Sequence, residues 1–207
     1  MESSCPRPRT LPPETRREQI IAGVLRAVAE HGVAEATTAR IARAAGVSEG
    51  ALYLHFRSRT EMLMATLDSI FGQMMEVVGE SADMSAVEQL RSIEQRHSEL
   101  IRVENGGFAY PWIEFIAAGA QTGLREAVAE TQRKVFREIR GVIDRGKAEG
   151  TIRPDLDSDR AAWLHIAQAW ADNMAFCIGL NEYFNLGCSD YFEELLISNI
   201  EEKPEIL

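Results

Sequence analysis

The stretch TTARIARAAGVSEGALYLHF, from Thr37 to Phe56, constrains the fold of this chain more than any other part of its sequence. It holds two short apolar patterns of helical spacing, separated by Gly46, which favours a left-handed backbone and so ends the first helix. Ser48 is suited to cap the second helix, on which Leu52 and Phe56 share one face. The sequence therefore predicts two short helices joined by a tight turn, which is a helix-turn-helix.

The second helix of this pair has a slender first turn, formed by Glu49, Gly50 and Ala51. In a helix-turn-helix, this turn is the part that enters the major groove of DNA and meets the edges of the bases. Small side chains leave the helix thin enough for a close approach. These three residues are the predicted base-contacting group.

Charge is distributed unevenly along the chain. The formal net charge is −10 at pH 7, which by itself argues against a nucleic-acid partner. Residues 1–60, however, carry nine arginines and six glutamates, a net charge of +3, whereas residues 61–207 carry −13. This asymmetry indicates a basic module that binds a polyanion and an acidic body that keeps the protein in solution.

Helical periodicity continues through the rest of the chain, and no segment shows the sustained alternation that marks a strand. The predicted fold class is all-α, with about nine helices. We expect an N-terminal arm at 1–14, a three-helix helix-turn-helix domain at 15–58 and a larger helical body at 59–207. Besides the two short helices, we expect helices near 15–31, 59–80, 85–104, 108–120, 124–149, 158–180 and 189–202.

The segment TTARIARAAGVSEGALYLHFRSRTEML resembles the DNA-binding signature of the TetR (tetracycline-repressor) family. The pattern T-x-x-x-I-A-x-x-A-G-V-S-x-G-x-L-Y-x-H-F is intact from Thr37 to Phe56. The match covers a small part of the chain, but its many coincident positions make it specific. One departure is Arg59, which stands where many members of the family have lysine; an arginine at this position keeps the ability to bind a phosphate.

The resemblance implies roles for residues in and beside the helix pair. The hydroxyl of Thr38 and the N-terminus of its helix offer donors to a phosphate, and arginines at helix starts would grip flanking phosphates. Tyr53 and His55 are placed to meet the DNA backbone, with the alternative that they only cover the small core. The expected DNA contacts are Arg16, Arg17, Thr38, Arg40, Ser48, Glu49, Gly50, Ala51, Tyr53, His55 and Arg59.

The resemblance also implies that the body binds a ligand and that its last two helices pair with a second subunit. Such a homodimer would bind a palindromic operator in double-stranded DNA. The segment RAAWLHIAQAWADNMAFCIGL is apolar on nearly every side, which suits a helix packed on its own core and on a partner; a buried helix in a monomer is the alternative. The expected interface consists of Leu164, Ala171, Ala175, Ile178, Phe192 and Leu196.

Aromatic residues in the body predict a cavity for an apolar or planar effector. Its expected lining is Phe71, Phe108, Trp112, Glu114, Phe115, Phe136, Trp163 and Trp170. Ordinary core packing explains each aromatic residue singly, and Glu114 either neutralises a cationic ligand or points to water. His97 and His165 are interpreted as helix-face histidines, because no metal-ligand spacing accompanies them.

Other classes of function find less support in the sequence. No GxGxxG, GxxxxGK[ST] or GxSxG motif indicates an enzyme, and neither a cofactor nor a metal is expected. A redox-responsive regulator using Cys177 and Cys188 stays open, as does a helical enzyme with no visible motif. The chain lacks a membrane-spanning run and a secretory pattern, which predicts a cytoplasmic location and no membrane partner. The predicted function is a homodimeric transcriptional repressor that a small apolar or aromatic effector releases from its operator.

Overall fold

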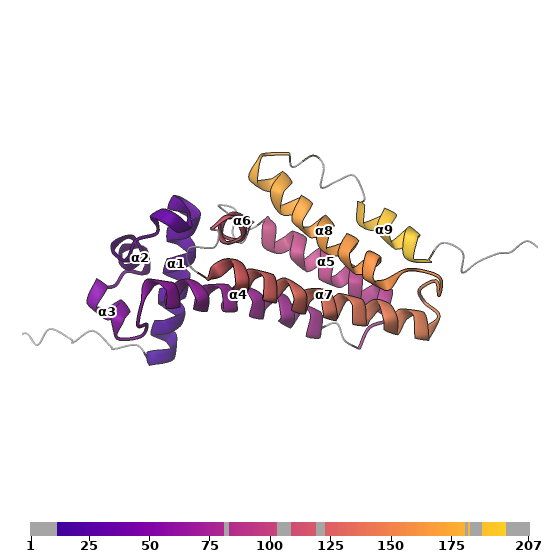
Figure 1. The fold of residues 1–207 in the computed structure, drawn as a ribbon, viewed down its shortest axis with the longest axis horizontal. Helices are drawn as coiled ribbons and strands as arrows, with labels where there is room; N and C mark the ends of the chain where they lie inside the picture. The colour runs from indigo at the N-terminus through magenta and orange to yellow at the C-terminus, as the bar shows by residue number, and fades with distance from the viewer. Residues whose placement is uncertain are drawn as a thin grey trace, which may run out of the picture. The chain divides into compact units, whose positions relative to one another are not determined.

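The computed structural model describes residues 12–80, 83–102, 109–118, 123–180, 182 and 188–197. Over these residues the chain forms nine α-helices and no strand, which confirms the all-α expectation (Figure 1). The helices are α1 (Pro13–Glu35), α2 (Thr38–Ala45), α3 (Glu49–Tyr53), α4 (Arg59–Glu80), α5 (Ala86–Ile101), α6 (Ala109–Ala117), α7 (Leu124–Glu149), α8 (Ser158–Cys177) and α9 (Cys188–Ile197). The chain divides into two compact units, Met1–Thr66 and Leu67–Leu207, and the boundary falls inside α4.

The first unit is built by packing α2 against α1 and α3 against α2. Ile20, Ile41 and Leu52, one from each helix, are fully buried. The contact between α1 and α2 is very close, because a Cβ atom built on Gly23 would lie 2.5 Å from the Cβ atom of Ala45. Only glycine at position 23 therefore allows these two helices to meet as they do.

Helix α1 extends beyond the end that Gly32 predicts. The backbone at Gly32 has φ 75° and ψ 163°, which is outside the helical region, so the regular helix does break at this residue. A further short turn follows and ends at Glu35, and Ala36 then leads into α2. Glycine was the correct signal for the break, but the chain resumes a helical turn after it.

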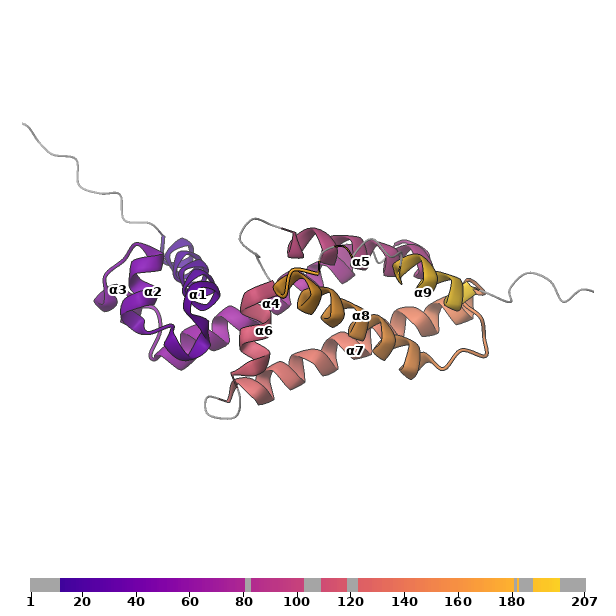
Figure 2. The same cartoon turned by 90° about the horizontal axis from the view of Figure 1, so that it is seen from above.

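The second unit is a helical bundle in which α7 packs against α5, α6 and α8 (Figure 2). Its core contains side chains from α5 and α7 to α9, among them Leu90, Ile139 and Ile166. A Cβ atom on Gly146 would lie 2.7 Å from the Cβ atom of Ala86, so glycine allows α7 to pass close to the start of α5.

The buried residues of α9 correct one expectation. Phe192 and Leu196 were expected at a subunit interface, but both lie in the core of their own subunit, with Leu196 fully buried. The backbone N–H of Arg153 also donates to the carbonyl oxygen of Leu196 at 3.0 Å. The surface that α9 leaves exposed is instead formed by Tyr191 and Ile197.

Candidate nucleic-acid interface and internal cavity

Local hydrogen bonds fix the turn between α2 and α3. The hydroxyl of Thr37 accepts from the backbone N–H of Arg40 at 3.4 Å, and the hydroxyl of Ser48 accepts from that of Ala51 at 3.2 Å. Between the two caps, Gly46 adopts φ 68°, in the left-handed region where glycine is favoured. Gly46 and the Ser48 cap lie where the sequence predicts them.

The first turn of α3 is open to the outside of the unit. Gly50 is exposed, and a Cβ atom built on it would have only the Ser48 hydroxyl oxygen nearby, at 3.9 Å. Packing inside the protein therefore does not require a glycine at this position, in contrast to Gly23. Tyr53 lies on the same short helix, and 53% of its surface is exposed. Small and polar groups on this turn thus form a surface that a partner can approach closely.

The hydroxyl of Thr38 is engaged within the unit. It donates to the carboxylate of Glu49 at 2.8 Å, across the turn between the two helices. This contact places a carboxylate on the exposed surface at the start of α3. A carboxylate can accept a hydrogen bond from the amino group of cytosine in the major groove.

The four arginines predicted to contact DNA all have hydrogen-bond partners inside the first unit. Arg16 donates to Gln19 at 2.8 Å, and Arg40 donates to the carboxylate of Glu35 at 3.0 Å. Arg17 donates to the carbonyl oxygen of His55 at 3.2 Å, and its guanidinium stacks 4.2 Å from the centre of the Phe56 ring.

Arg59 binds two backbone carbonyl groups of the first unit. Its guanidinium donates to the carbonyl oxygens of Ala36, at 2.8 Å, and of Val33. These groups lie at the end of α1, where carbonyl oxygens have no helical partner. In this arrangement Arg59 holds the end of α1, and a contact with phosphate would require these bonds to break.

Two arginines that the sequence analysis did not select are better placed to meet a polyanion. Arg43 and Arg57 are exposed, and their guanidinium groups have no partner in the described part of the chain. Arg57 follows α3 and donates its backbone N–H to Glu61 at 2.5 Å, which leaves its side chain available. Its position directly after the second helix of the pair was the signal that could have identified it.

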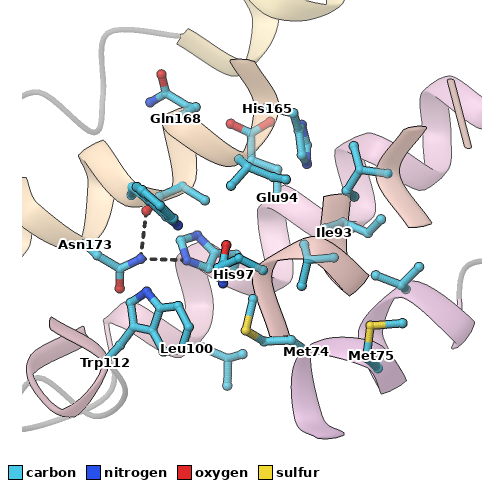
Figure 3. Close-up of a pocket in the computed structure, with 17 residues that line it drawn as sticks. Met74, Met75, Ile93, Glu94, His97, Leu100, Trp112, His165, Gln168 and Asn173 are labelled. Carbon is cyan, nitrogen blue, oxygen red and sulfur yellow. Dashed lines mark hydrogen bonds between the residues drawn. The ribbon is translucent and has the colours of Figure 1, made fainter. Parts of the chain in front are cut away.

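The second unit contains a cavity of about 70 Å³ lined by side chains of α4 to α8 (Figure 3). Most of this lining is apolar, and Trp112 and Trp170 belong to it as expected. Trp170 also lines an outer groove of about 440 Å³, together with Phe136 and Trp163. Phe115 is fully buried and lines neither the cavity nor the outer groove.

The remaining expected lining residues lie elsewhere. Phe71 packs against the core of the unit, with the ammonium group of Lys134 5.6 Å from its ring centre. Glu114 is half-buried and lines neither hollow. Phe108 lies outside the described residues.

Two histidines bring polar groups to the inner cavity, which the sequence analysis did not anticipate. The side-chain amide of Asn173 donates to the carbonyl oxygen of Ala169 at 2.7 Å and lies 3.0 Å from the Nε2 atom of His97 (Figure 3). Burial lowers the pKa of His97 to about 4. Burial and the nearby His97 lower the pKa of His165 to about 4 as well. Both imidazoles are therefore neutral at pH 7.

Exposed apolar side chains follow one side of α8 and its C-terminal end. Leu164 is 51% exposed and Ile178 is 61% exposed. Ala171 is also exposed and Ala175 is half-buried, so the surface between these larger residues is shallow. Exposed apolar side chains on one side of a helix make this surface a candidate site for a protein partner.

The described residues contain no group of three or more histidine, cysteine or acidic side chains that could hold a metal ion. No described helix combines the length and the apolar character needed to cross a membrane. Cys177 is half-buried, and this burial raises the pKa of its thiol, which makes the reactive thiolate scarcer.

Comparison with known proteins relates both units to bacterial regulators. The family described as "Bacterial regulatory proteins, tetR family" matches residues 20–66. The transcriptional repressor KstR2 of Rhodococcus jostii is 31% identical over 163 residues, which are 75% of this chain and 76% of that protein. The fatty acid metabolism regulator protein of Bacillus subtilis is 24% identical over 187 residues, 89% of this chain and 95% of that protein.

Solved structures share the fold. The Bacillus subtilis regulator FadR in complex with stearoyl-CoA superposes with a TM-score of 0.74 at 23% identity, covering 89% of this chain and 99% of that one. A transcriptional regulator from Chloroflexus aurantiacus superposes with a TM-score of 0.75 at 22% identity, covering 87% of this chain and 93% of that one. At these identities the similarity concerns the fold alone.

Proposed function

This chain belongs to the TetR family of bacterial regulatory proteins, and we propose that it is a homodimeric repressor that an effector releases from a palindromic operator. The observation that carries this proposal is the exposed first turn of α3, where Gly50 is small for no reason of internal packing. A glycine on the exposed side of a helix lets the helix backbone approach a DNA groove closely.

DNA binding would combine this turn with the charged groups around it. Gly50 and Ala51 allow the backbone of α3 to approach the bases, and Glu49 supplies an acceptor at the groove floor. Arg43 and Arg57 provide cations for the flanking phosphates, which position the helix without reading sequence. Arg17 donates to the carbonyl oxygen of His55 and stacks on Phe56. These contacts would hold α3, the helix that contacts the bases, in place.

Effector control would act through α4. The first residues of this helix, from Arg59 to Thr66, belong to the DNA-binding unit, whereas Met74 and Met75 line the inner cavity of the second unit. A ligand that enlarges the cavity would displace the part of α4 that carries Met74 and Met75. In a dimer, this movement would change the distance between the two α3 helices that contact the operator. A preference of about 1–3 kcal/mol for the displaced state changes operator affinity about 5- to 150-fold.

Two alternatives are less well supported by the residues. A redox switch would use Cys177, but its half-buried thiol with a raised pKa is a poor sensor, and the side chain of Cys188 lies outside the described residues. An enzyme would need a catalytic group in a cavity, and the relatives of this chain are regulators of transcription.

The proposal is tested by the substitution Ala51→Glu. A glutamate here stands three residues after Ser48 and completes a capping box, so α3 should keep its stability while its DNA-facing surface becomes bulky and negative. We expect operator binding, measured by gel shift on a site selected from random DNA, to fall at least about a hundredfold. Helical content and melting temperature should match wild type.

The matched control is Ala29→Glu, the same substitution at an exposed position of α1. It should leave operator binding close to wild type. Normal binding by the Ala51→Glu variant, or failure of the wild-type protein to select any sequence, would contradict the proposed function.

A further inference from the structure

Three polar atoms of the inner cavity are buried and have no hydrogen-bond partner among the described residues. They are the Nδ1 atom of His97, the Nε2 atom of Gln132 and the Oδ1 atom of Asn173. Asn173 is only 1% exposed, and the other two side chains also line the cavity. A buried polar atom without a partner is costly and uncommon. Three of them around one cavity indicate that a polar group binds there.

The hydrogen bonds of Asn173 determine what the cavity offers. A backbone carbonyl only accepts, so the atom of Asn173 that lies 2.7 Å from the Ala169 oxygen must be the amide nitrogen. The second N–H of that nitrogen is then directed at the Nε2 atom of His97, 3.0 Å away (Figure 3). Nε2 therefore accepts, and the single proton of the neutral ring lies on Nδ1.

The cavity thus presents both kinds of hydrogen-bonding group. His97 offers an N–H donor at Nδ1, Gln132 offers an amide N–H donor, and Asn173 offers an acceptor oxygen. A hydroxyl group both donates and accepts, so it can pair with either kind.

Charge disfavours anionic ligands. Among the described residues, the lining of the cavity contains no lysine or arginine, and both of its histidines are neutral at pH 7. Glu94 also lines the cavity, so a bound carboxylate would meet a like charge and no counterion.

The size of the cavity indicates which part of a ligand it holds. An apolar cavity of about 150 Å³ accommodates benzene, and this one measures about 70 Å³. Met74 and Met75 form part of its wall, and methionine side chains change conformation readily to make room. Gln132 and Trp170 line both the cavity and the outer groove, so a longer ligand has space to continue there.

We propose that the effector is an uncharged molecule with an apolar body and a hydroxyl group, which His97, Gln132 and Asn173 bind inside the second unit. This assignment rests on the proposed function for the existence of an effector, and on the cavity for its chemistry. Asn173 and His97 would determine specificity, since they distinguish a ligand with a hydroxyl from a hydrocarbon of equal size.

The test compares four ligands of one shape: benzyl alcohol, toluene, benzoate and benzylamine. Binding to the full-length protein at pH 7.5 is measured by calorimetry and thermal shift. We expect benzyl alcohol to bind about five- to tenfold more tightly than toluene, which corresponds to one net hydrogen bond. Benzoate should not bind detectably. Benzylamine should bind more weakly than benzyl alcohol, because its ammonium group must leave water for a mostly apolar lining.

Two variants and one spectroscopic measurement make the assignment specific. Asn173→Leu keeps the side-chain volume and removes the amide, so benzyl alcohol and toluene should bind about equally, whereas Gln95→Leu on the exposed side of α5 should keep the wild-type preference. Nitrogen-15 NMR of histidine in the wild-type protein should show the proton of His97 on Nδ1.

Several outcomes would overturn the proposal. They are a proton on Nε2, tighter binding of benzoate, benzylamine or toluene than of benzyl alcohol, no binding of any of the four, or an unchanged preference in Asn173→Leu. None of them bears on operator binding, which gel shift measures separately. If the wild-type protein binds no operator but keeps the ligand preference, only the proposed function is refuted.

Discussion

Arg57 and Arg59 are two residues apart, yet the structure gives them different tasks. The guanidinium of Arg59 holds two carbonyl oxygens at the end of α1, whereas that of Arg57 is exposed. Arg59→Ala should therefore lower the free energy of unfolding by about 1–2 kcal/mol, because it removes two hydrogen bonds to the backbone at the end of α1. Arg57→Ala should leave stability unchanged and weaken binding to all DNA sequences, with the salt slope reduced by about one.

Urea denaturation and gel shifts at several salt concentrations separate the two effects. Arg57 and Arg59 serve as each other's control, since both changes remove one positive charge. A reduced salt slope in Arg59→Ala without loss of stability would return the phosphate contact to Arg59, where the sequence analysis placed it.

A comparison of Gly46 and Ser48 with Arg59 shows what the local sequence can and cannot predict. Gly46 and Ser48 were predicted correctly because each acts through backbone groups within a few residues of itself. The partners of Arg59 are Val33 and Ala36, more than 20 residues earlier in the chain, and only the packed fold brings them together. No pattern in the sequence specifies that encounter.

At the scale of helices, substitutions at two glycines distinguish a helix surface packed inside the protein from one that faces outward. A Cβ atom on Gly23 would clash with Ala45 at 2.5 Å, whereas one on Gly50 would meet only the hydroxyl oxygen of Ser48, at an ordinary contact distance of 3.9 Å. Gly23→Ala should therefore destabilise the protein by about 1–3 kcal/mol through overpacking of α1 on α2. Gly50→Ala should be neutral or stabilising, because alanine favours the helix, yet it should weaken operator binding.

Thermal melting and gel shift on both variants provide the measurement, and the chemical change is the same methyl group in each. Equal losses of stability would mean that the α3 surface is packed within the protein. Full operator affinity in Gly50→Ala would argue against a close approach of this turn to DNA.

The exposed side of α8 is where we expect a second subunit. Leu164→Glu combined with Ile178→Glu should convert the dimer into a monomer, because charge is placed in the middle of an apolar surface. Sedimentation velocity at low micromolar concentration measures the change. Met84→Glu, at an exposed apolar residue that precedes α5, is the matched control. A dimer that survives the double substitution would locate the interface elsewhere.

Sequence periodicity identified which helices have two apolar sides but not which side faces inward. Phe192 and Leu196 carry the apolar pattern of α9 and were assigned to a partner, yet they complete the core of their own subunit. Either use satisfies the same periodicity, so the pattern alone could not decide between them.

For the molecule as a whole, the inner cavity was the feature that sequence could predict least. Its lining comes from five helices, and its polar groups, His97 and Asn173, are 76 residues apart in the chain. Aromatic content predicted that a cavity exists and identified Trp112 and Trp170. The neutral histidines required the structure, because the tautomer of His97 follows from its contact with Asn173 and the low pKa of both rings follows mainly from burial.

These histidines give the whole molecule a predictable response to acid. The pKa of His97 and of His165 is about 4 in the folded protein and about 6.5 in an unfolded chain. Between these values the unfolded chain binds more protons than the folded one, so lowering the pH favours unfolding. The stabilisation is complete above about pH 6.5 and is lost as the pH falls toward 4, by up to about 1.4 kcal/mol per pH unit for each histidine.

We therefore expect the urea midpoint to be constant from pH 8 to 7 and to fall between pH 6.5 and 5, before most carboxylates titrate. Replacing His165 with phenylalanine, which retains an aromatic ring next to Phe192, should roughly halve that slope because one of the two titrating groups is gone. Burial raises the pKa of Asp172, so protonation of this carboxyl favours the folded state and opposes the loss of stability in acid. A midpoint that does not change from pH 6.5 to 5 would mean that these imidazoles are already accessible to protons in the folded protein, and that the cavity around them is open to water.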